Sequence, residues 1–167
     1  MQSLLWNMPT QVFFSDNCLA EHADVFKLGK KALIVTGHNS SKINGSLADV
    51  EAALAKNSIP YAVFDKVPGN PDIAICYEGA EVARKEQADF IVAIGGGSPI
   101  DAAKAMWVFY EHPEATFEEI KKPFNIPKLR NKAIFVAIPS TSGTATEVTA
   151  FSVITDYSTN IKYPLAD

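Results

Sequence analysis

The chain has 167 residues, of which 47% are hydrophobic and 20% charged, so it can bury one sizeable core and is expected to be a soluble globular domain. A net charge of −4 provides no general basic field and argues against nucleic acid as the main partner. No run approaches the ~20 apolar residues of a membrane span, and Cys18 and Cys76 lack metal-ligand or CxxC spacing, which favours a cytoplasmic protein with no membrane partner.

Apolar runs and helical spacing predict strands that alternate with helices along the chain. In order, we expect a short edge strand at 11–14, a strand at 30–36, a helix through 47–54 capped by Asn44 or Ser46, a strand at 61–64, a helix that opens at 70–72, a strand at 90–94, a helix at 102–110, and strands at 133–138 and 152–155. This alternation implies right-handed βαβ units. The predicted fold class is α/β, a Rossmann-like, doubly wound and mostly parallel sheet.

Polar or glycine-rich segments follow the ends of four predicted strands, at 37–42, 68–71, 95–101 and 139–146. In a parallel sheet, ligands bind outside the carboxyl ends of the strands, near the point where the strand order reverses. We therefore expect these four segments to lie along one rim.

The third of these segments begins with three consecutive glycines, Gly95 to Gly97, directly after a buried strand. Glycines remove side chains where a pyrophosphate must approach the backbone, and the following helix adds unpaired N–H groups and the positive end of its dipole. Ser98 adds a hydroxyl donor, and Asp101 lies just inside the helix. The segment predicts a nucleotide site, although its spacing fits neither standard nucleotide fingerprint. The alternative is that the glycines only make a turn and Asp101 only stabilises the helix N-terminus.

Hydroxyl residues cluster around Gly143 in the fourth segment, Pro139 to Thr146, and could donate to phosphate or ribose. Such clusters also occur in plain loops that satisfy their own backbone. At the end of the first long strand, an acidic residue would accept hydrogen bonds from the adenosine ribose, but this chain has Gly37 there, followed by polar residues. Removing the carboxylate removes its repulsion of a 2′-phosphate, so this segment favours NADP, unless it is only a solvated loop.

Reactive side chains form no recognisable catalytic pattern in the sequence. No group of His, Asp and Glu has metal-site spacing, and there is no Ser/His/Asp or Cys/His nucleophile arrangement. From its residues alone, the chain can hold a nucleotide but lacks the groups that would carry out a reaction.

Two motifs taken together resemble the iron-containing (group III) alcohol dehydrogenases. Residues 95–104, Gly-Gly-Gly-Ser-Pro-Ile-Asp-Ala-Ala-Lys, match the family pattern GGGSPxDxAK, and residues 138–149 are similar to its IPTTAGTGSEVT. Ser140 and Ser142 replace the usual Thr and Ala, which keeps or adds a hydroxyl. The resemblance covers nearly the whole chain. It implies that residues 1–167 form the dinucleotide-binding domain, the N-terminal half of a two-domain dehydrogenase.

The resemblance also implies a chemistry. Family members hold Fe²⁺ or Zn²⁺, which polarises the oxygen of a primary alcohol or aldehyde while hydride passes to or from NAD(P). Three histidines of a second, helical domain and an aspartate shortly before it bind that metal. Asp167 precedes the position of this aspartate. We therefore expect no complete metal site here, a metal only in an absent C-terminal domain, and a chain that is incomplete and inactive alone.

Site residues follow from the resemblance position by position. They are Gly96, Gly97, Ser98 and Asp101 for the pyrophosphate and the nicotinamide side, Asn70, Ser140, Thr141, Thr144, Thr149 and Lys162 for the rest of the cofactor, and Phe151 and Val153 for the substrate. The bulky Phe151 suggests a substrate less polar than a diol. Gly37 stands where the family commonly has Asp, which again favours NADP, with NAD as the alternative.

Two other interpretations stay open. The dehydroquinate synthase and glycerol dehydrogenase branch shares a glycine triplet after a strand, although residues 98–104 and 139–144 fit the iron-containing alcohol dehydrogenases better. The chain could also be only a nucleotide-binding or self-associating module. A homodimer is expected, because the apolar segment 11–14 could pair across a dimer, as the N-terminal strands of the family do.

Overall fold

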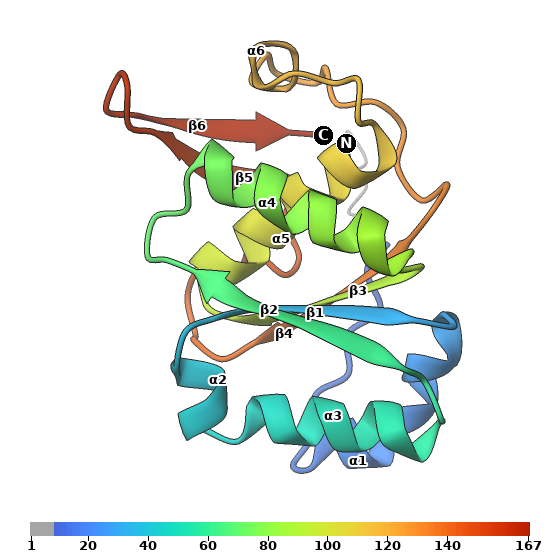
Figure 1. The fold of residues 1–167 in the computed structure, drawn as a ribbon. Helices are drawn as coiled ribbons and strands as arrows, with labels where there is room; N and C mark the ends of the chain where they lie inside the picture. Colours follow the sequence, from blue (N-terminus) through green and yellow to red (C-terminus); the bar gives the residue numbers. More distant parts are fainter. Residues whose placement is uncertain (1–8) are drawn as a thin grey trace, which may run out of the picture.

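A four-stranded sheet with helices on both faces dominates the computed structural model, which describes residues 9–167 (Figure 1). The elements are α1 (Cys18–Glu21), the 3-10 helix η1 (Ala23–Leu28), β1 (Ala32–Gly37), α2 (Ser40–Ile43), α3 (Ser46–Lys56), β2 (Tyr61–Val67), α4 (Ile73–Glu86), β3 (Phe90–Gly95), α5 (Gly97–Glu111), α6 (Phe117–Ile120), β4 (Ile134–Pro139), β5 (Phe151–Asp156) and β6 (Ile161–Ala166). None of the helices within residues 9–167 has the length and apolar character needed to cross a membrane.

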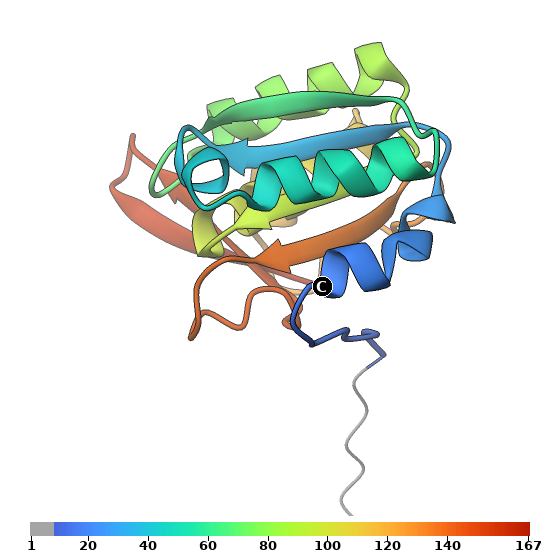
Figure 2. The same cartoon turned by 90° about the horizontal axis from the view of Figure 1, so that it is seen from below.

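The four strands of the main sheet are all parallel and lie in the order β2-β1-β3-β4. From β1 the chain moves to β2 on one side and then crosses back to β3 on the other, so the strand order reverses between β1 and β3. Helix α3 covers one face of the sheet, and α4 and α5 cover the other (Figures 1 and 2). The predicted α/β, Rossmann-like and doubly wound fold is confirmed.

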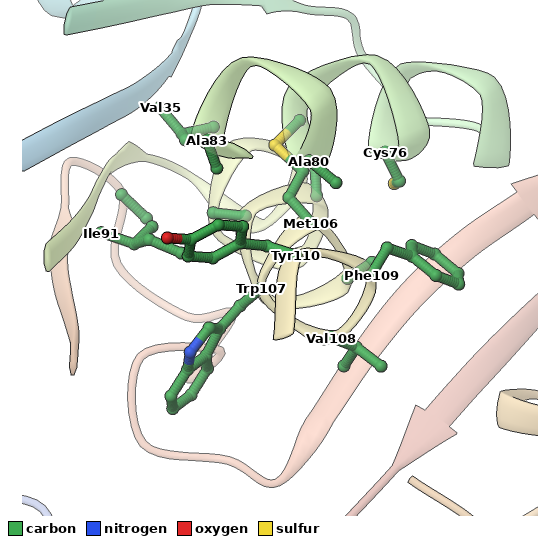
Figure 3. Packing of buried hydrophobic residues seen from close by; sticks show 14 of the residues in the cluster. Val35, Cys76, Ala80, Ala83, Ile91, Met106, Trp107, Val108, Phe109 and Tyr110 are labelled. Carbon is green, nitrogen blue, oxygen red and sulfur yellow. The ribbon is translucent and has the colours of Figure 1, made fainter. Parts of the chain in front are cut away.

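Both faces of the central strands are buried, which explains the solid apolar runs of β1 and β3. Residues such as Leu33 and Ile91 pack with α4 and α5, and Figure 3 shows Ile91 beside the ring of Tyr110 of α5. Their neighbours in sequence, such as Ile34 and Val92, pack with α3 and η1. Side chains of a strand alternate between faces, so one continuous run supplies two cores.

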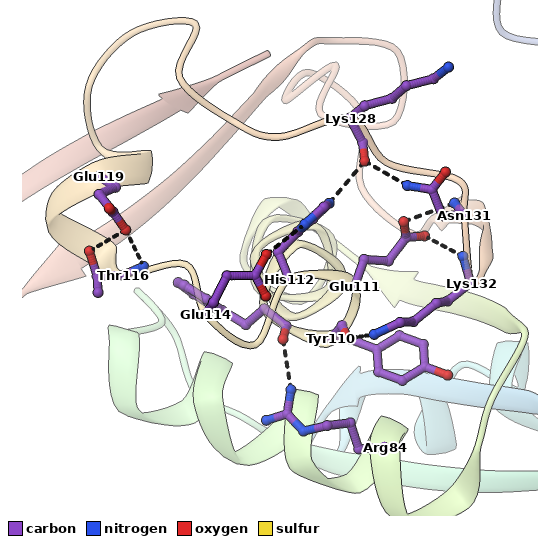
Figure 4. Close-up of polar contacts among 11 residues, drawn as sticks. Arg84, Tyr110, Glu111, His112, Glu114, Thr116, Glu119, Lys128, Asn131 and Lys132 are labelled. Carbon is purple, nitrogen blue, oxygen red and sulfur yellow. Dashed lines mark hydrogen bonds and ion pairs between the residues drawn. The ribbon is translucent and has the colours of Figure 1, made fainter.

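A buried carboxylate fixes the far end of α5, away from the glycine turn. Glu111 is 5% exposed and accepts five hydrogen bonds of 2.9–3.2 Å. The donors are Trp107 Nε1 and the backbone N–H groups of Arg130, Asn131, Lys132 and Ala133. Figure 4 shows the carboxylate facing this segment, which leads directly into β4. Glu111 therefore anchors the start of the edge strand to the end of α5.

Several details differ from the sequence predictions. The strand expected at 11–14 is wrong: these residues have no regular structure, and Phe14 is 97% exposed. A strand needs a hydrogen-bonding neighbour, and none of the strands in residues 9–167 lies beside this segment. Helix α5 begins at Gly97, not at 102, because glycines and Pro99 are tolerated in a first turn.

Several elements were not predicted, among them strand β6 and the short helices α2 and α6. Strand β6 pairs antiparallel with β5 in a separate hairpin, and the short helix α2 lies within the polar segment 37–42. The expected cap of α3 is partly correct, because Asn44 Oδ1 accepts a 3.0 Å hydrogen bond from the N–H of Ser46, although the N-cap position itself is Gly45.

Candidate functional site

A pocket of about 400 Å³ opens beside the glycine turn, close to the reversal of strand order between β1 and β3. This volume lies within the range typical of small-molecule sites. The lining residues come from the β2–α4 loop, the first turn of α5, the β4–β5 loop and the β5–β6 hairpin. They are Asn70, Pro71, Gly97, Ser98, Asp101, Thr144, Thr146, Thr149, Phe151, Val153, Thr155 and Lys162.

The glycine turn exposes backbone to this pocket. Gly95 has φ +142°, a conformation that side chains rarely allow, and a Cβ on Gly96 would lie 3.0 Å from Thr141 Oγ1. Gly96 is the N-cap of the 15-residue helix α5, and no side chain caps its first N–H groups. Unpaired N–H groups and the helix dipole therefore make this wall of the pocket favourable for an anion.

We expect Gly95→Ala to destabilise the fold by about 2 kcal/mol, because the new Cβ would be held at a strained φ. It would also lie 2.7 Å from Pro99 Cγ. Urea unfolding measures the loss. Gly97→Ala is the matched control: its Cβ would meet Thr144 Cγ2 at 3.5 Å, an ordinary contact, so its stability should change by less than about 0.5 kcal/mol. Equal losses in both variants would contradict the argument from backbone strain.

Asn70 joins three parts of the pocket wall. Its left-handed backbone (φ 56°) aims its N–H at Ser98 Oγ, 3.3 Å away. Lys162 Nζ donates to Asn70 Oδ1 at 2.8 Å, and Tyr157 Oη donates to the Asn70 carbonyl at 3.1 Å. These contacts tie the β5–β6 hairpin to the β2–α4 loop and to the glycine turn, although the three segments are far apart in sequence.

Asp101 lies in the pocket one turn into α5. Its Oδ1 accepts a hydrogen bond from Thr146 Oγ1, and its backbone carbonyl accepts one of 2.7 Å from Ser152 Oγ. Burial raises the pKa of the Asp101 carboxyl, while the Thr146 hydroxyl and the Lys104 ammonium act in the opposite direction. The β4–β5 loop thus contacts the side chain of Asp101, just beyond the first turn of α5.

Gly37 ends β1 on the same rim, next to the glycine turn. A Cβ there would lie 3.8 Å from Pro99 Cγ and 3.4 Å from the Val67 carbonyl, so a side chain could be accommodated. Beyond it, Lys42 Nζ pairs with Asp65 Oδ2, and this contact holds the pKa of the Asp65 carboxyl below its usual value. Segment 37–42 itself contains no acidic residue, and Asp65 of the neighbouring strand β2 is paired with Lys42.

Most of the residues proposed from the sequence meet in this pocket. Nine of them line it: Asn70, Gly97, Ser98, Asp101, Thr144, Thr149, Phe151, Val153 and Lys162. The other four lie nearby on the rim: Gly37 beside Pro99, Gly96 against Thr141, and Ser140, whose N–H donates to the Gly95 carbonyl at 2.8 Å. Pro71, Thr146 and Thr155 line the pocket without having been singled out. Thr146 belongs to the hydroxyl cluster at 139–146, so the sequence did contain an indication that it could lie at the site.

The residues do not fit a resident metal. Within residues 9–167, no group of three or more His, Cys, Asp or Glu side chains could hold a metal ion. The pocket offers glycine backbone, hydroxyls, an amide and one lysine, which are donors for phosphate and ribose oxygens.

Comparisons with known proteins agree with this geometry. The family model for iron-containing alcohol dehydrogenases matches residues 9–167. An NADPH-dependent butanol dehydrogenase of Clostridium saccharobutylicum is 52% identical over 162 residues, which are 97% of this chain and 41% of that protein. The match favours this family over the dehydroquinate synthase and glycerol dehydrogenase branch.

Solved structures show the same fold. An iron-containing alcohol dehydrogenase from Thermotoga maritima superposes with a TM-score of 0.88 at 37% identity, over 97% of this chain and 44% of that one. An NADH-dependent butanol dehydrogenase from the same organism gives 0.87 at 28% identity, over 100% and 42%. The chain thus spans less than half the length of these relatives.

Proposed function

The chain belongs to the family of iron-containing alcohol dehydrogenases, and on that premise we propose that it is the cofactor-binding portion of an oxidoreductase that moves hydride between NADP and a primary alcohol or aldehyde. One observation carries the proposal: the uncapped N-terminus of α5 opens into a pocket that is also lined by hydroxyl, amide and lysine donors. Such a site suits a pyrophosphate flanked by sugar hydroxyls.

Each wall of the pocket has a part in this proposal. The backbone N–H groups of Gly97 and Ser98 bind the pyrophosphate, and Asn70, Thr144 and Lys162 hold the neighbouring oxygens. Gly96, Ser140 and Thr141 form the adjoining turn that keeps the backbone accessible.

The nicotinamide and the substrate belong to the other end of the pocket. Asp101 faces the nicotinamide side, Thr149 contacts a further part of the cofactor, and Phe151 and Val153 offer apolar surface to an alcohol chain. Phe151 is 49% exposed, so it can contact a substrate that approaches from outside. The apolar contact favours an alcohol less polar than a diol.

The preference for NADP rests on Gly37. No carboxylate stands at the end of β1 to repel a 2′-phosphate, and Lys42 pairs with Asp65 of the neighbouring strand β2. The relative that is 52% identical is named NADPH-dependent, which supports the same preference.

We place the metal outside the described residues, on side chains that the family carries in its second, helical domain. When bound there, it would act as a Lewis acid toward the substrate oxygen. The chain's own residues bind and orient the cofactor. We further propose a cytoplasmic homodimer, supported by the exposed apolar side chains of Val12 and Phe14.

Titration of the purified chain with NADPH, NADH and ATP tests the proposal, with nicotinamide fluorescence and calorimetry as readouts. We expect NADPH to bind most tightly and ATP least. Gly97→Leu should abolish NADPH binding because its side chain would fill the pocket beside Thr144. The smaller change Gly97→Ala should leave the fold intact. The proposal fails if ATP matches both nicotinamide cofactors, or if Gly97→Leu binds NADPH as the parent chain does.

A further inference from the structure

A single lysine fastens the β4–β5 loop to α5. Lys104 Nζ donates hydrogen bonds to three backbone carbonyls, those of Thr146, Thr149 and Phe151, with distances of 2.8 Å to the last two. An ammonium group has three N–H donors, so all three are used on one short segment. This lysine is the last residue of the glycine-rich motif, but it does not line the pocket.

The segment that Lys104 holds has little structure of its own. Residues 140–150 form no helix or strand, and residues 140–145 are exposed. Its backbone hydrogen bonds to the rest of the fold include Ser140 to Gly95 at one end and Asp167 to Ala150 at the other. Apart from these bonds, the carbonyls of Thr146, Thr149 and Phe151 accept hydrogen bonds from Lys104. The loop conformation therefore depends on a side chain 42 or more residues earlier in the chain.

Nearby carboxylates favour the charged form of Lys104, which donates these three hydrogen bonds. Burial lowers the pKa of Lys104, but the nearby carboxylates of Asp101 and Glu147 favour its charged form. One carboxylate oxygen of Glu147 is buried without a hydrogen-bond partner among the described residues. Hydrogen bonds from a charged donor in a partly buried site are stronger than those between neutral groups.

We propose that Lys104 is a positioning residue for the pocket. By holding three carbonyls of residues 146–151, it places Thr146, Thr149 and Phe151 in the pocket wall and brings Thr146 to Asp101. The link to cofactor binding rests on the function proposed above. The link between Lys104 and the loop conformation stands independently of it.

Removing the ammonium tests both links. In Lys104→Ala, amide hydrogen exchange in the free chain should rise by about tenfold or more at Val148, whose N–H donates to the Ala145 carbonyl, and at Asp167, whose N–H donates to the Ala150 carbonyl, while β1 and β3 stay protected. The Kd for NADPH should rise by a similar factor. Lys56→Ala, at an exposed position of α3 on the opposite face of the sheet, is the matched control and should change neither quantity. If Lys104→Ala does not fold, Lys104→Met keeps the aliphatic stem, loses the donors and carries the same readouts.

Chemical rescue distinguishes positioning from a general loss of stability. Propylammonium can occupy the space of the missing side chain and restore the three N–H donors, so it should recover both the exchange protection and the NADPH affinity of Lys104→Ala. Tetramethylammonium has the same charge without donors and should recover neither. Unchanged exchange at Val148 and Asp167, or equal rescue by both cations, would overturn the inference. If the parent chain itself does not bind NADPH, the proposed function fails, and the exchange measurement still decides the role of Lys104.

Discussion

Replacing Gly37 by aspartate is expected to weaken NADPH binding by about a hundredfold and to leave NADH binding equal or stronger. The new carboxylate would stand at the end of β1, where it repels a 2′-phosphate but can accept hydrogen bonds from the ribose hydroxyls of NADH. The fold should tolerate the change, because a Cβ at this position would meet only ordinary contacts, the nearest 3.4 Å from the Val67 carbonyl.

Gly37→Asn separates charge from size. Asparagine has almost the same shape as aspartate but no charge, so it should lower NADPH affinity much less. Calorimetric titration of each variant with NADPH and NADH at low and high salt provides the measurement, and added salt should narrow the gap between the two variants. If Gly37→Asn and Gly37→Asp lost NADPH affinity equally, steric exclusion and not charge would explain the preference, and the proposed basis for NADP selection would be wrong.

The strands that were predicted best from the sequence are those buried on both faces, because such burial produces a continuous run of apolar residues. β1 and β3 are covered on both faces, so every residue from Ala32 to Val35 and from Phe90 to Ile94 is apolar and buried. The segment 11–14 has a similar apolar run but no neighbouring strand among the described residues, and composition alone could not reveal this. β6 contains Lys162 and Pro164, and its strand conformation depends on pairing with β5.

The site was predictable as far as it depends on the ends of strands. Topology brings the glycine turn, Asn70 and the hydroxyl loop to one rim. Each of these segments could be recognised in the sequence because it contains glycine or hydroxyl residues directly after a strand. Contacts across the rim carry no such signal. The hydrogen bonds of Lys104 to residues 146–151, and of Tyr157 to Asn70, join positions that no spacing rule relates. They follow from the packing of the hairpin against α5, which only the structure shows.

Replacing Glu111 by glutamine is expected to lower the free energy of unfolding by about 3 kcal/mol at pH 7, because hydrogen bonds to a buried charged group are worth about 1.5–3 kcal/mol each and several are weakened together. Glu111 accepts four backbone N–H groups and the Trp107 indole, and an amide would turn an NH₂ group toward some of these donors. Urea unfolding measures the change. Glu118→Gln, at a side chain that is 74% exposed, should change stability by less than about 0.5 kcal/mol.

The pH dependence of this difference tests its cause. Burial alone would raise the pKa of Glu111, but the backbone N–H groups of residues 131–133 and the Trp107 indole outweigh it and lower the pKa below its usual value. A lowered pKa in the folded state means that the carboxylate stabilises the fold fully above the unfolded value of about 4.3, and that this contribution is lost as the pH falls through the folded value. The gap between the parent chain and Glu111→Gln should therefore stay constant from about pH 7 to pH 5 and close below about pH 4. A gap that widened on acidification would mean that folding favours the protonated acid, and the anchoring of β4 by a buried anion would have to be abandoned.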